Sequence, residues 1–423
     1  MTRGRLALVQ HRLVVGVQGS RFARWGLVTA AVMAVLGQWY LHLQFWSQIP
    51  ATDVRVYAQG GRWALAHADV YAGTFETAFT GFLPFSYPPF AAVLMIPVGM
   101  LPDAWLMPVW TLASLVSLAA ILALSFNAVL IRSPRRWLLI VMALIVVIPT
   151  EPISELLPFG QIGTILTLAC LLDVMGRSGR LPRGVLVGLM TAVKLTPGLF
   201  IVHWFTTKQW RPALTACTTT AVAWCVGALW LPESTWTYLW TQRLIVNPTA
   251  RAASPALEYN QSLGGLLARL HDGDIPVRVY VPLALLLCAA GLFAAAVVWR
   301  ANDPIGTAAV VGLTSVMVSP VSWSHHAVWM LPALGAVVGN GRSPRRVAVG
   351  IGLLACLYYP TRGWQPIEST FAFQEVWFVL YGLTLILLTS ISWRAVHRTD
   401  RTSRPDSADP VPPAPGPAGL VPA

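Results

Sequence analysis

Residues 184–205 read GVLVGLMTAVKLTPGLFIVHWF, an apolar stretch that is long enough to cross a membrane. Its middle, however, holds Lys194-Leu195-Thr196-Pro197. Proline removes a backbone N–H and disfavours helix at the residue before it, so the sequence predicts two short helices that meet at this break. An ammonium group is costly in an apolar run. Lys194 therefore marks either a functional site with an anionic partner or a side chain that reaches out to water.

The rest of the chain is similarly apolar. Of its 423 residues, 56% are hydrophobic and only 11% are charged, against about a quarter charged in soluble domains. A mean hydropathy of +0.62 extends over nearly the whole length, which excludes a single anchor on a soluble domain, a disordered chain and a disulfide-built secreted fold. We read the five cysteines as small core residues.

The net charge of +12 could indicate nucleic-acid binding. The basic residues, however, lie in short clusters between apolar runs, as they do in the cytoplasmic loops of membrane proteins. We therefore expect membrane lipids, and no nucleic acid, among the partners, while the oligomeric state stays open.

The basic clusters also decide between two topologies, because Lys and Arg in short loops favour the cytoplasmic side. If residues 89–102 are re-entrant and the break at Lys194 is a hairpin tip, about twelve membrane helices result, some of them short or broken. Making 89–102 and 184–206 full spans would move the basic clusters at 132–136 and 177–183 outside. We predict the first topology, that of an all-α, multi-pass protein of the plasma membrane with both termini in the cytoplasm.

On this topology residues 25–393 form a single membrane domain that follows a basic cytoplasmic arm at residues 1–24. Two long loops, about 47–88 and 232–275, face the extracytoplasmic side. The tail at residues 394–423 is rich in Pro and Ala and cannot build a core, so we expect it to be disordered in the cytoplasm.

Asp53 is the first candidate for catalysis. It directly follows the first predicted membrane helix, with apolar neighbours on both sides. Partial desolvation would raise the pKa of its carboxyl group and make it a better base than a free aspartate. The alternative is an ordinary helix-capping carboxylate.

Further polar residues occur at the predicted outer ends of helices. Tyr87 lies in FSYPPF, a turn signal, and Gln161 opens a helix where its amide could hold a hydroxyl group or simply end the helix. Asn260 and Gln261 lie in EYNQS, and consecutive amides suit sugar hydroxyls, although an ordinary polar loop looks the same.

His325 and His326 lie between two apolar runs. Adjacent histidines point apart on a helix, and no third ligand is near in sequence, so no metal site is expected. One ring could bind a phosphate or a substrate while the other packs or caps.

These residues come from distant parts of the chain, yet a topology chosen only from basic loops places all of them on the outer side. ATP and nucleotide sugars are in the cytoplasm, on the other side of the membrane. An enzyme that works on the outer side needs an activated donor delivered within the membrane.

Six stretches together resemble glycosyltransferase family 87, the polyprenyl-phosphate-mannose-dependent α-1,2-mannosyltransferases with a GT-C fold. In order along the chain, from residue 53 to about residue 332, they read DVRVYAQGG, FSYPPFAAVL, FGQIGTILTL, AVKLTPGLF, EYNQSLGGLLARL and SPVSWSHHAVWMLP. Each stretch alone is weak, and six in order are specific.

The resemblance implies that Asp53 is the general base that activates the acceptor hydroxyl, with inversion from a β-linked donor to an α-linked product. It implies that Lys194, with His325 or His326, binds the donor phosphate. We assign substrate binding to residues within the matching stretches: Tyr57, Tyr87, Gln161, Asn260 and Gln261. No metal or other cofactor is expected, because a monophosphate leaving group has no pyrophosphate to chelate.

The implied acceptor is a mannolipid, either a phosphatidylinositol mannoside or lipomannan and lipoarabinomannan, and no residue separates these cases. The alternative from another class is a secondary transporter or lipid flippase, since broken helices and a membrane-embedded lysine suit transporters. The inverted repeat found in many transporters is not visible in this sequence. A non-catalytic membrane scaffold leaves the polar residues on one side unexplained.

Overall fold

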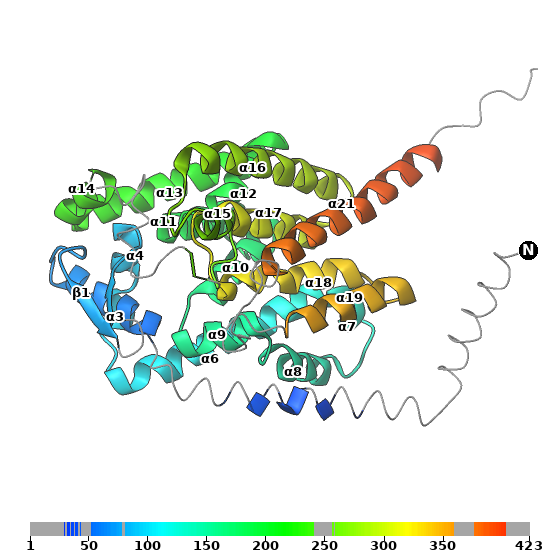
Figure 1. The fold of residues 1–423 in the computed structure, drawn as a ribbon, viewed down its shortest axis with the longest axis horizontal. Helices are drawn as coiled ribbons and strands as arrows, with labels where there is room; N and C mark the ends of the chain where they lie inside the picture. Colours follow the sequence, from blue (N-terminus) through cyan, green and yellow to red (C-terminus); the bar gives the residue numbers. More distant parts are fainter. Residues whose placement is uncertain are drawn as a thin grey trace, which may run out of the picture.

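The chain folds into packed apolar helices with a small layer of shorter elements at one end (Figure 1). The computed structural model describes residues 52–77, 81–240, 256–257, 259–358 and 376–402, together with isolated residues between 29 and 43. The predicted basic arm and most of the first predicted membrane helix lie outside these residues. The described elements are, in order, α3 (Thr52–Leu65), β1 (Thr74–Thr77), β2 (Gly81–Pro84), α4 (Pro89–Leu94), α5 (Ile96–Gly99), α6 (Asp103–Ser125), α7 (Asn127–Leu130), α8 (Arg136–Val147), α9 (Glu151–Phe159), α10 (Gly163–Val174), α11 (Val185–Val193), α12 (Gly198–Thr206), α13 (Trp210–Trp230), α14 (Pro232–Trp240), α15 (Leu263–Leu270), α16 (Val277–Arg300), α17 (Pro304–Val318), the 3-10 helix η2 (Ser324–Trp329), α18 (Met330–Val338), α19 (Pro344–Cys356) and α21 (Val376–Thr402).

Four described helices have the length and hydropathy to cross a membrane, namely α6, α13, α16 and the Val376–Val396 part of α21. A fifth crossing results if α8 and α9, which bend by 88° between them, count as one span. These helices identify a helical, multi-pass membrane protein. The remaining apolar helices are shorter, so the predicted count of twelve stays a prediction.

The break at Lys194 is present as the sequence predicts. Helix α11 ends at Val193, Lys194 is extended with φ −148° and ψ 130°, and α12 begins at Gly198 directly after Pro197. The segment at 89–102 likewise forms two short helices, α4 and α5, and no full span.

Three features differ from prediction. Of the five cysteines interpreted as core residues, only Cys170 is buried, whereas Cys288 is half-buried and Cys217, Cys225 and Cys356 are exposed. The antiparallel hairpin β1–β2, in which Thr74 pairs with Pro84, is an exception to the all-α prediction, because aromatic and β-branched residues flank a turn there. Helix α21 also continues to Thr402, beyond the predicted tail boundary at 394. Hydropathy marks where an apolar segment ends, whereas no helix breaker occurs before Pro405. Residues 403–423 lie outside the described part.

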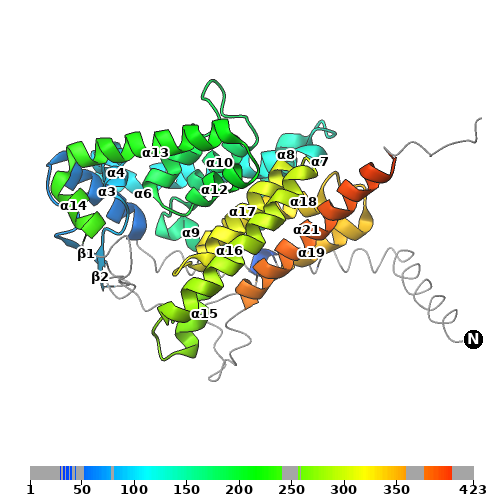
Figure 2. The same ribbon diagram turned by 90° about the horizontal axis from the view of Figure 1, so that it is seen from above.

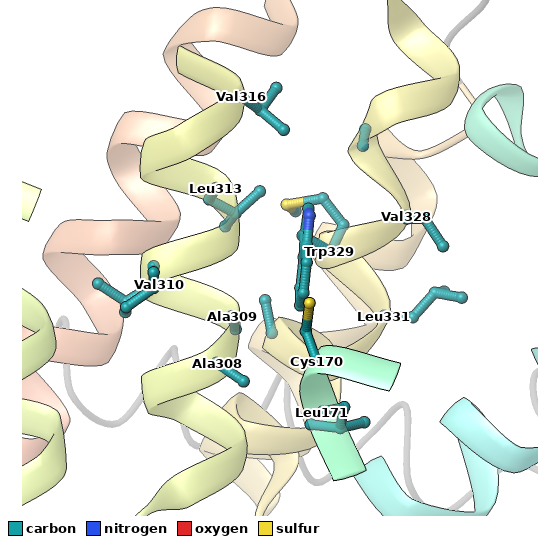
Figure 3. Packing of buried hydrophobic residues seen from close by; sticks show 14 of the residues in the cluster. Cys170, Leu171, Ala308, Ala309, Val310, Leu313, Val316, Val328, Trp329 and Leu331 are labelled. Carbon is teal, nitrogen blue, oxygen red and sulfur yellow. The ribbon is translucent and has the colours of Figure 1, made fainter. Parts of the chain in front are cut away.

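The main apolar core lies where α10, α17, η2 and α18 meet. Trp329, at the end of η2, is 4% exposed and lies between Leu313 of α17 and Cys170 of α10 (Figure 3). Helices α16, α17 and α21 run side by side along this core (Figure 2). Because Trp329 belongs to η2, its packing fixes the short helix that carries both candidate histidines.

A second apolar cluster joins α3, the hairpin and α4. Tyr238 of α14 closes it by stacking on Tyr71, with ring centroids 5.9 Å apart. The two predicted outer loops therefore contribute ordered elements to one layer, which holds α3 at the end of the helical core.

Candidate active site

Asp53 lies in the first turn of α3, near the N-terminal end of the helix dipole, which favours a negative charge. Its carboxylate accepts a hydrogen bond from the side chain of Gln161. Burial raises the pKa of Asp53 above its ordinary value of 3.8, while His325, the Gln161 hydrogen bond and Lys194 partly offset that rise. The site thus holds a carboxylate that is more basic than a free aspartate.

Gly160 lets Gln161 reach this position. Gly160 ends α9 with φ 68°, in the left-handed region that glycine tolerates best. A Cβ atom at Gly160 would also come within 2.8 Å of the Cβ of Val54. The close approach of the end of α9 to α3 therefore depends on this glycine, and it places Gln161 beside Asp53.

A directed hydrogen-bond chain supports the Asp53 carboxylate. The Tyr57 hydroxyl donates to Oε1 of Gln161 at 3.1 Å, and the hydroxyls of Tyr57 and Tyr87 lie 3.0 Å apart. Since Tyr57 uses its only proton on Gln161, Tyr87 is the donor to Tyr57. Because the amide oxygen of Gln161 accepts from Tyr57, the N–H groups of the same amide face Asp53. Every proton in the chain therefore points toward the carboxylate.

Aromatic packing holds the two tyrosines in place. Tyr57 is 2% exposed and lies against Trp110, with ring centroids 5.4 Å apart. The hydroxyl of Tyr71 donates to the backbone carbonyl of Tyr87 at 2.6 Å. Burial raises the pKa of both Tyr57 and Tyr87, so both hydroxyl groups keep their protons.

Lys194 and His326 form a contact pair on the other side of Tyr87. The Nζ atom of Lys194 lies 2.9 Å from Nε2 of His326 and 5.7 Å from the centre of the Tyr87 ring. The extended backbone at the α11–α12 break carries Lys194 to this position. Burial, then the charge of Lys194, lowers the pKa of His326 well below 6.5, so this imidazole is neutral.

His325 lies beside this pair, and its ring centroid is 4.7 Å from that of His326. It is 4% exposed, and its Nδ1 lies 3.6 Å from Oε2 of Glu155 in α9. The same carboxylate accepts a hydrogen bond from the hydroxyl of Ser324. Adjacent residues of η2 thus contact one buried carboxylate.

Asn260 and Gln261 serve a different part of the molecule. Asn260 accepts hydrogen bonds from the backbone N–H of Ser322 at 2.8 Å and from the hydroxyl of Ser262 at 2.9 Å. Gln261 accepts from the backbone N–H groups of Trp377 and Phe378 at 3.1 Å and 3.3 Å. Both amides are almost fully buried. They join the segment before η2 to the start of α21 rather than lining the space beside Asp53.

The structure therefore brings together most of the predicted site residues and separates them by exposure. Asp53, Tyr87, Lys194 and His326 are partly exposed, while Tyr57, Gln161 and His325 are buried behind them. Glu155 and Ser324 are members of this cluster that the sequence interpretation missed. The signal for Glu155 was present in PISELLPF, because a carboxylate in an apolar run is as costly as the ammonium of Lys194.

Comparison with known sequences identifies one protein family and several relatives. The profile of glycosyltransferase family 87 matches residues 85–320 of this chain. A polyprenol-phosphate-mannose-dependent alpha-(1-2)-phosphatidylinositol mannoside mannosyltransferase of Mycobacterium tuberculosis is 35% identical over 368 residues, which cover 83% of this chain and 84% of the relative. A protein of the same name from Mycolicibacterium smegmatis is 33% identical, and the match covers 74% of this chain and 75% of the relative.

A more distant relative, also from Mycolicibacterium smegmatis, has a pentamannoside in its name. This polyprenol-phosphate-mannose-dependent alpha-(1-2)-phosphatidylinositol pentamannoside mannosyltransferase is 31% identical, and the match covers 64% of this chain and 66% of the relative. No solved structure matches the chain significantly. The family profile includes Tyr87, Gln161 and Lys194, whereas Asp53 and His325 lie outside the matched residues.

Proposed function

The chain belongs to glycosyltransferase family 87, and on this premise we propose that it transfers mannose from polyprenol-phosphate-mannose to a phosphatidylinositol mannoside in α-1,2 linkage. Family membership favours this glycosyltransferase over a secondary transporter or a lipid flippase. The observation that carries the proposal is the cluster in which Asp53 lies among Gln161, His325 and Lys194. These four residues, which include the base and a cationic group, come from four separate parts of the chain.

Asp53 acts as the general base in this proposal. The acceptor hydroxyl oxygen attacks C1 of the mannosyl group, the C1–O bond to the phosphate breaks, and its electron pair leaves with the phosphate. Asp53 takes the hydroxyl proton, and the configuration at C1 inverts from β to α. The raised pKa of Asp53 supports this role, because proton transfer is most effective when the pKa of the base is near the working pH.

Lys194 stabilises the negative charge that grows on the leaving phosphate. Its ammonium is partly exposed beside Tyr87, and the neutral His326 ring holds it from behind. A preformed cation that faces the leaving group lowers the barrier without reorganising in the transition state. His325, which lies next to both Asp53 and His326, is the second residue assigned to the donor phosphate.

The acceptor assignment follows the identities of the relatives. The two relatives with phosphatidylinositol mannoside in their names cover more of this chain than the pentamannoside relative. Lipomannan and lipoarabinomannan are the competing acceptors. The partly exposed hydroxyl of Tyr87 is assigned to direct contact with substrate, while Tyr57 and Gln161 support Asp53 from behind.

We further propose the GT-C architecture, with about twelve membrane helices, for the complete domain. Its site faces the extracytoplasmic side of the plasma membrane. The arginine clusters at 132–136 and 177–183 support this orientation, because they flank the helix ends opposite to Gln161.

The experiment that tests the proposal measures transfer of radiolabelled mannose by the purified protein in detergent. Polyprenol-phosphate-mannose is the donor, and phosphatidylinositol mannosides and lipomannan are supplied as separate acceptors. We expect an α-1,2-linked product with a phosphatidylinositol mannoside, and a loss of about a hundredfold or more in Asp53→Asn, the range expected when a general base is removed. Asp274→Asn, the same change at an exposed aspartate, should keep full activity. Full activity of Asp53→Asn would contradict the assignment of the base.

A further inference from the structure

Glu155 occupies a position that the proposed reaction does not yet explain. It is 1% exposed and lies in the apolar helix α9. Burying a carboxylate is costly unless donors surround it. Two consecutive residues of η2 supply donors here: the hydroxyl of Ser324 donates to Oε2, and Nδ1 of His325 lies 3.6 Å from the same atom.

We propose that Glu155 is a positioning residue that fixes the imidazole of His325 through Nδ1 and so holds this ring beside His326 and near the carboxylate of Asp53. The inference rests on the proposed function, in which His325 belongs to the donor site. A carboxylate can only accept, so its partner nitrogen in the ring carries the proton. The same logic lets a carboxylate set the tautomer and the orientation of a histidine in other active sites.

The surroundings of His325 hold the ring on three sides. Phe159 lies one turn after Glu155 on the same face of α9, and its ring centroid is 5.9 Å from that of His325. His326 packs against another edge at 82°, with centroids 4.7 Å apart. Asp53 interacts electrostatically with His325 from α3. The ring thus interacts with the carboxylate of the base and with that of Glu155.

The separation of 3.6 Å is longer than a direct N–H···O hydrogen bond. Hydrogen bonds in catalytic sites are often long without substrate and shorten in the complex. The proposal therefore assigns Glu155 an effect on the turnover rate that acts through His325.

A direct test reads the proton on His325 in the resting protein. Protein with ¹⁵N-labelled histidine contains eight such residues, and a His325→Gln variant assigns the signals of this ring. We expect a proton on Nδ1, the nitrogen that faces the carboxylate of Glu155. A ring that is protonated at both nitrogens supports the proposal equally, whereas a neutral ring with a bare Nδ1 overturns it. This measurement needs no transfer activity.

A second test uses transfer kinetics. Glu155→Met keeps the approximate length of the side chain and removes the acceptor, so it should lower kcat about 10- to 100-fold, the range known for carboxylates that orient metal-binding histidines. The KM for the lipid-linked donor should change by less than about twofold, because Lys194 remains in place. Glu155→Gln retains an oxygen that accepts from Nδ1 and should recover part of the rate. Glu151→Met, at the start of the same helix, should retain the wild-type rate.

The outcomes separate the two proposals. Absence of transfer by the wild type would refute the proposed function, while the proton on Nδ1 still tests the role of Glu155. An unchanged kcat in Glu155→Met, or an equal loss in Glu151→Met, would overturn the positioning role and leave the mannosyltransferase assignment intact.

Discussion

The Nζ atom of Lys194 lies 2.9 Å from Nε2 of His326, so an ammonium group contacts an imidazole that is 132 residues away in sequence. An ammonium group can only donate hydrogen bonds, so Nε2 of His326 must accept the hydrogen bond from Lys194. The His326 ring is neutral with its own proton on Nδ1, and the positive charge of the pair belongs to Lys194. The first prediction follows from this distribution of charge.

Lys194→Met should weaken binding of the donor phosphate and also lower kcat, because the ammonium faces this phosphate both before and during its departure. A hydrogen bond from a charged group contributes about 1.5–3 kcal/mol, so the KM for the lipid-linked donor should rise roughly ten- to a hundredfold. Steady-state kinetics with varied donor measure this change. Lys208→Met removes the only other lysine, which is exposed in the loop after α12, and should leave KM unaltered. An unaltered KM in Lys194→Met would mean that the Lys194 side chain only reaches out to water and does not bind the donor.

Asp53→Asn should alter stability in a pH-dependent way. The pKa of Asp53 is raised in the folded protein, so its stabilising contribution is complete below 3.8 and is lost as the pH rises through the folded pKa. The variant cannot ionise at this position. Its unfolding temperature should equal that of the wild type near about pH 3 and should be at least as high near about pH 7. Thermal unfolding in detergent measures both, and a less stable variant at neutral pH would show that the ionised carboxylate stabilises the fold.

Tyr57→Phe should lower kcat about five- to tenfold, the effect of about 1 kcal/mol from one lost hydrogen bond. The reason is that Gln161 loses the donor that sets its orientation toward Asp53. Tyr280→Phe is the matched control, since it also loses a hydroxyl contact to a backbone carbonyl, that of Val318, but lies outside the chain that ends on Asp53. Equal rates for the two variants would mean that the chain has no role in transfer.

Gln261→Leu should reduce stability by about 1–3 kcal/mol, because the backbone N–H groups of Trp377 and Phe378 lose their common acceptor. The KM values of this variant should stay near those of the wild type. Gln261→Glu retains an acceptor oxygen at the N-terminal end of α21 and should be more stable than the leucine variant. Denaturation in detergent compares the three proteins. A raised acceptor KM at unchanged stability would instead favour substrate contact by Gln261.

Cysteine labelling tests the predicted topology. Asp272 and Arg345 are both exposed, and they follow α15 and begin α19, respectively. A membrane-impermeant maleimide added to intact cells should modify Asp272→Cys and leave Arg345→Cys unmodified until the membrane is opened. The parent protein controls for its own cysteines. Labelling of Arg345→Cys alone in intact cells would mean that the topology is the reverse of the predicted one and that the site faces the cytoplasm.

The parts of the fold that could be predicted depend on local chemistry. The interruption at Lys194 could be predicted because Pro197 breaks a helix wherever it occurs in one. The apolar stretches of α6, α13 and α16 could be predicted because hydropathy alone defines a membrane crossing. The hairpin could not, since its four-residue strands carry too little pattern to stand out beside the helices.

The parts of the site that could not be predicted depend on long-range pairing. Gln161 lies beside Asp53 in the structure, yet its partner Tyr57 is 104 residues away, and no local pattern reveals which way an amide faces. The amides of Asn260 and Gln261 look like sugar-binding groups in the sequence. In the structure their oxygens are occupied by backbone groups up to 117 residues away.

The contact between Gln261 and the first turn of α21 has a consequence for biosynthesis. Asp53, Gln161 and Lys194 enter the membrane early in translation, whereas the histidines of η2 and the helix anchored by Gln261 follow last. A ribosome-bound chain therefore contains the base and the ammonium before the segment that completes their surroundings is in place. We therefore expect sugar transfer only after α21 has been inserted, and we expect chains that stop before Trp377 not to consume lipid-linked mannose.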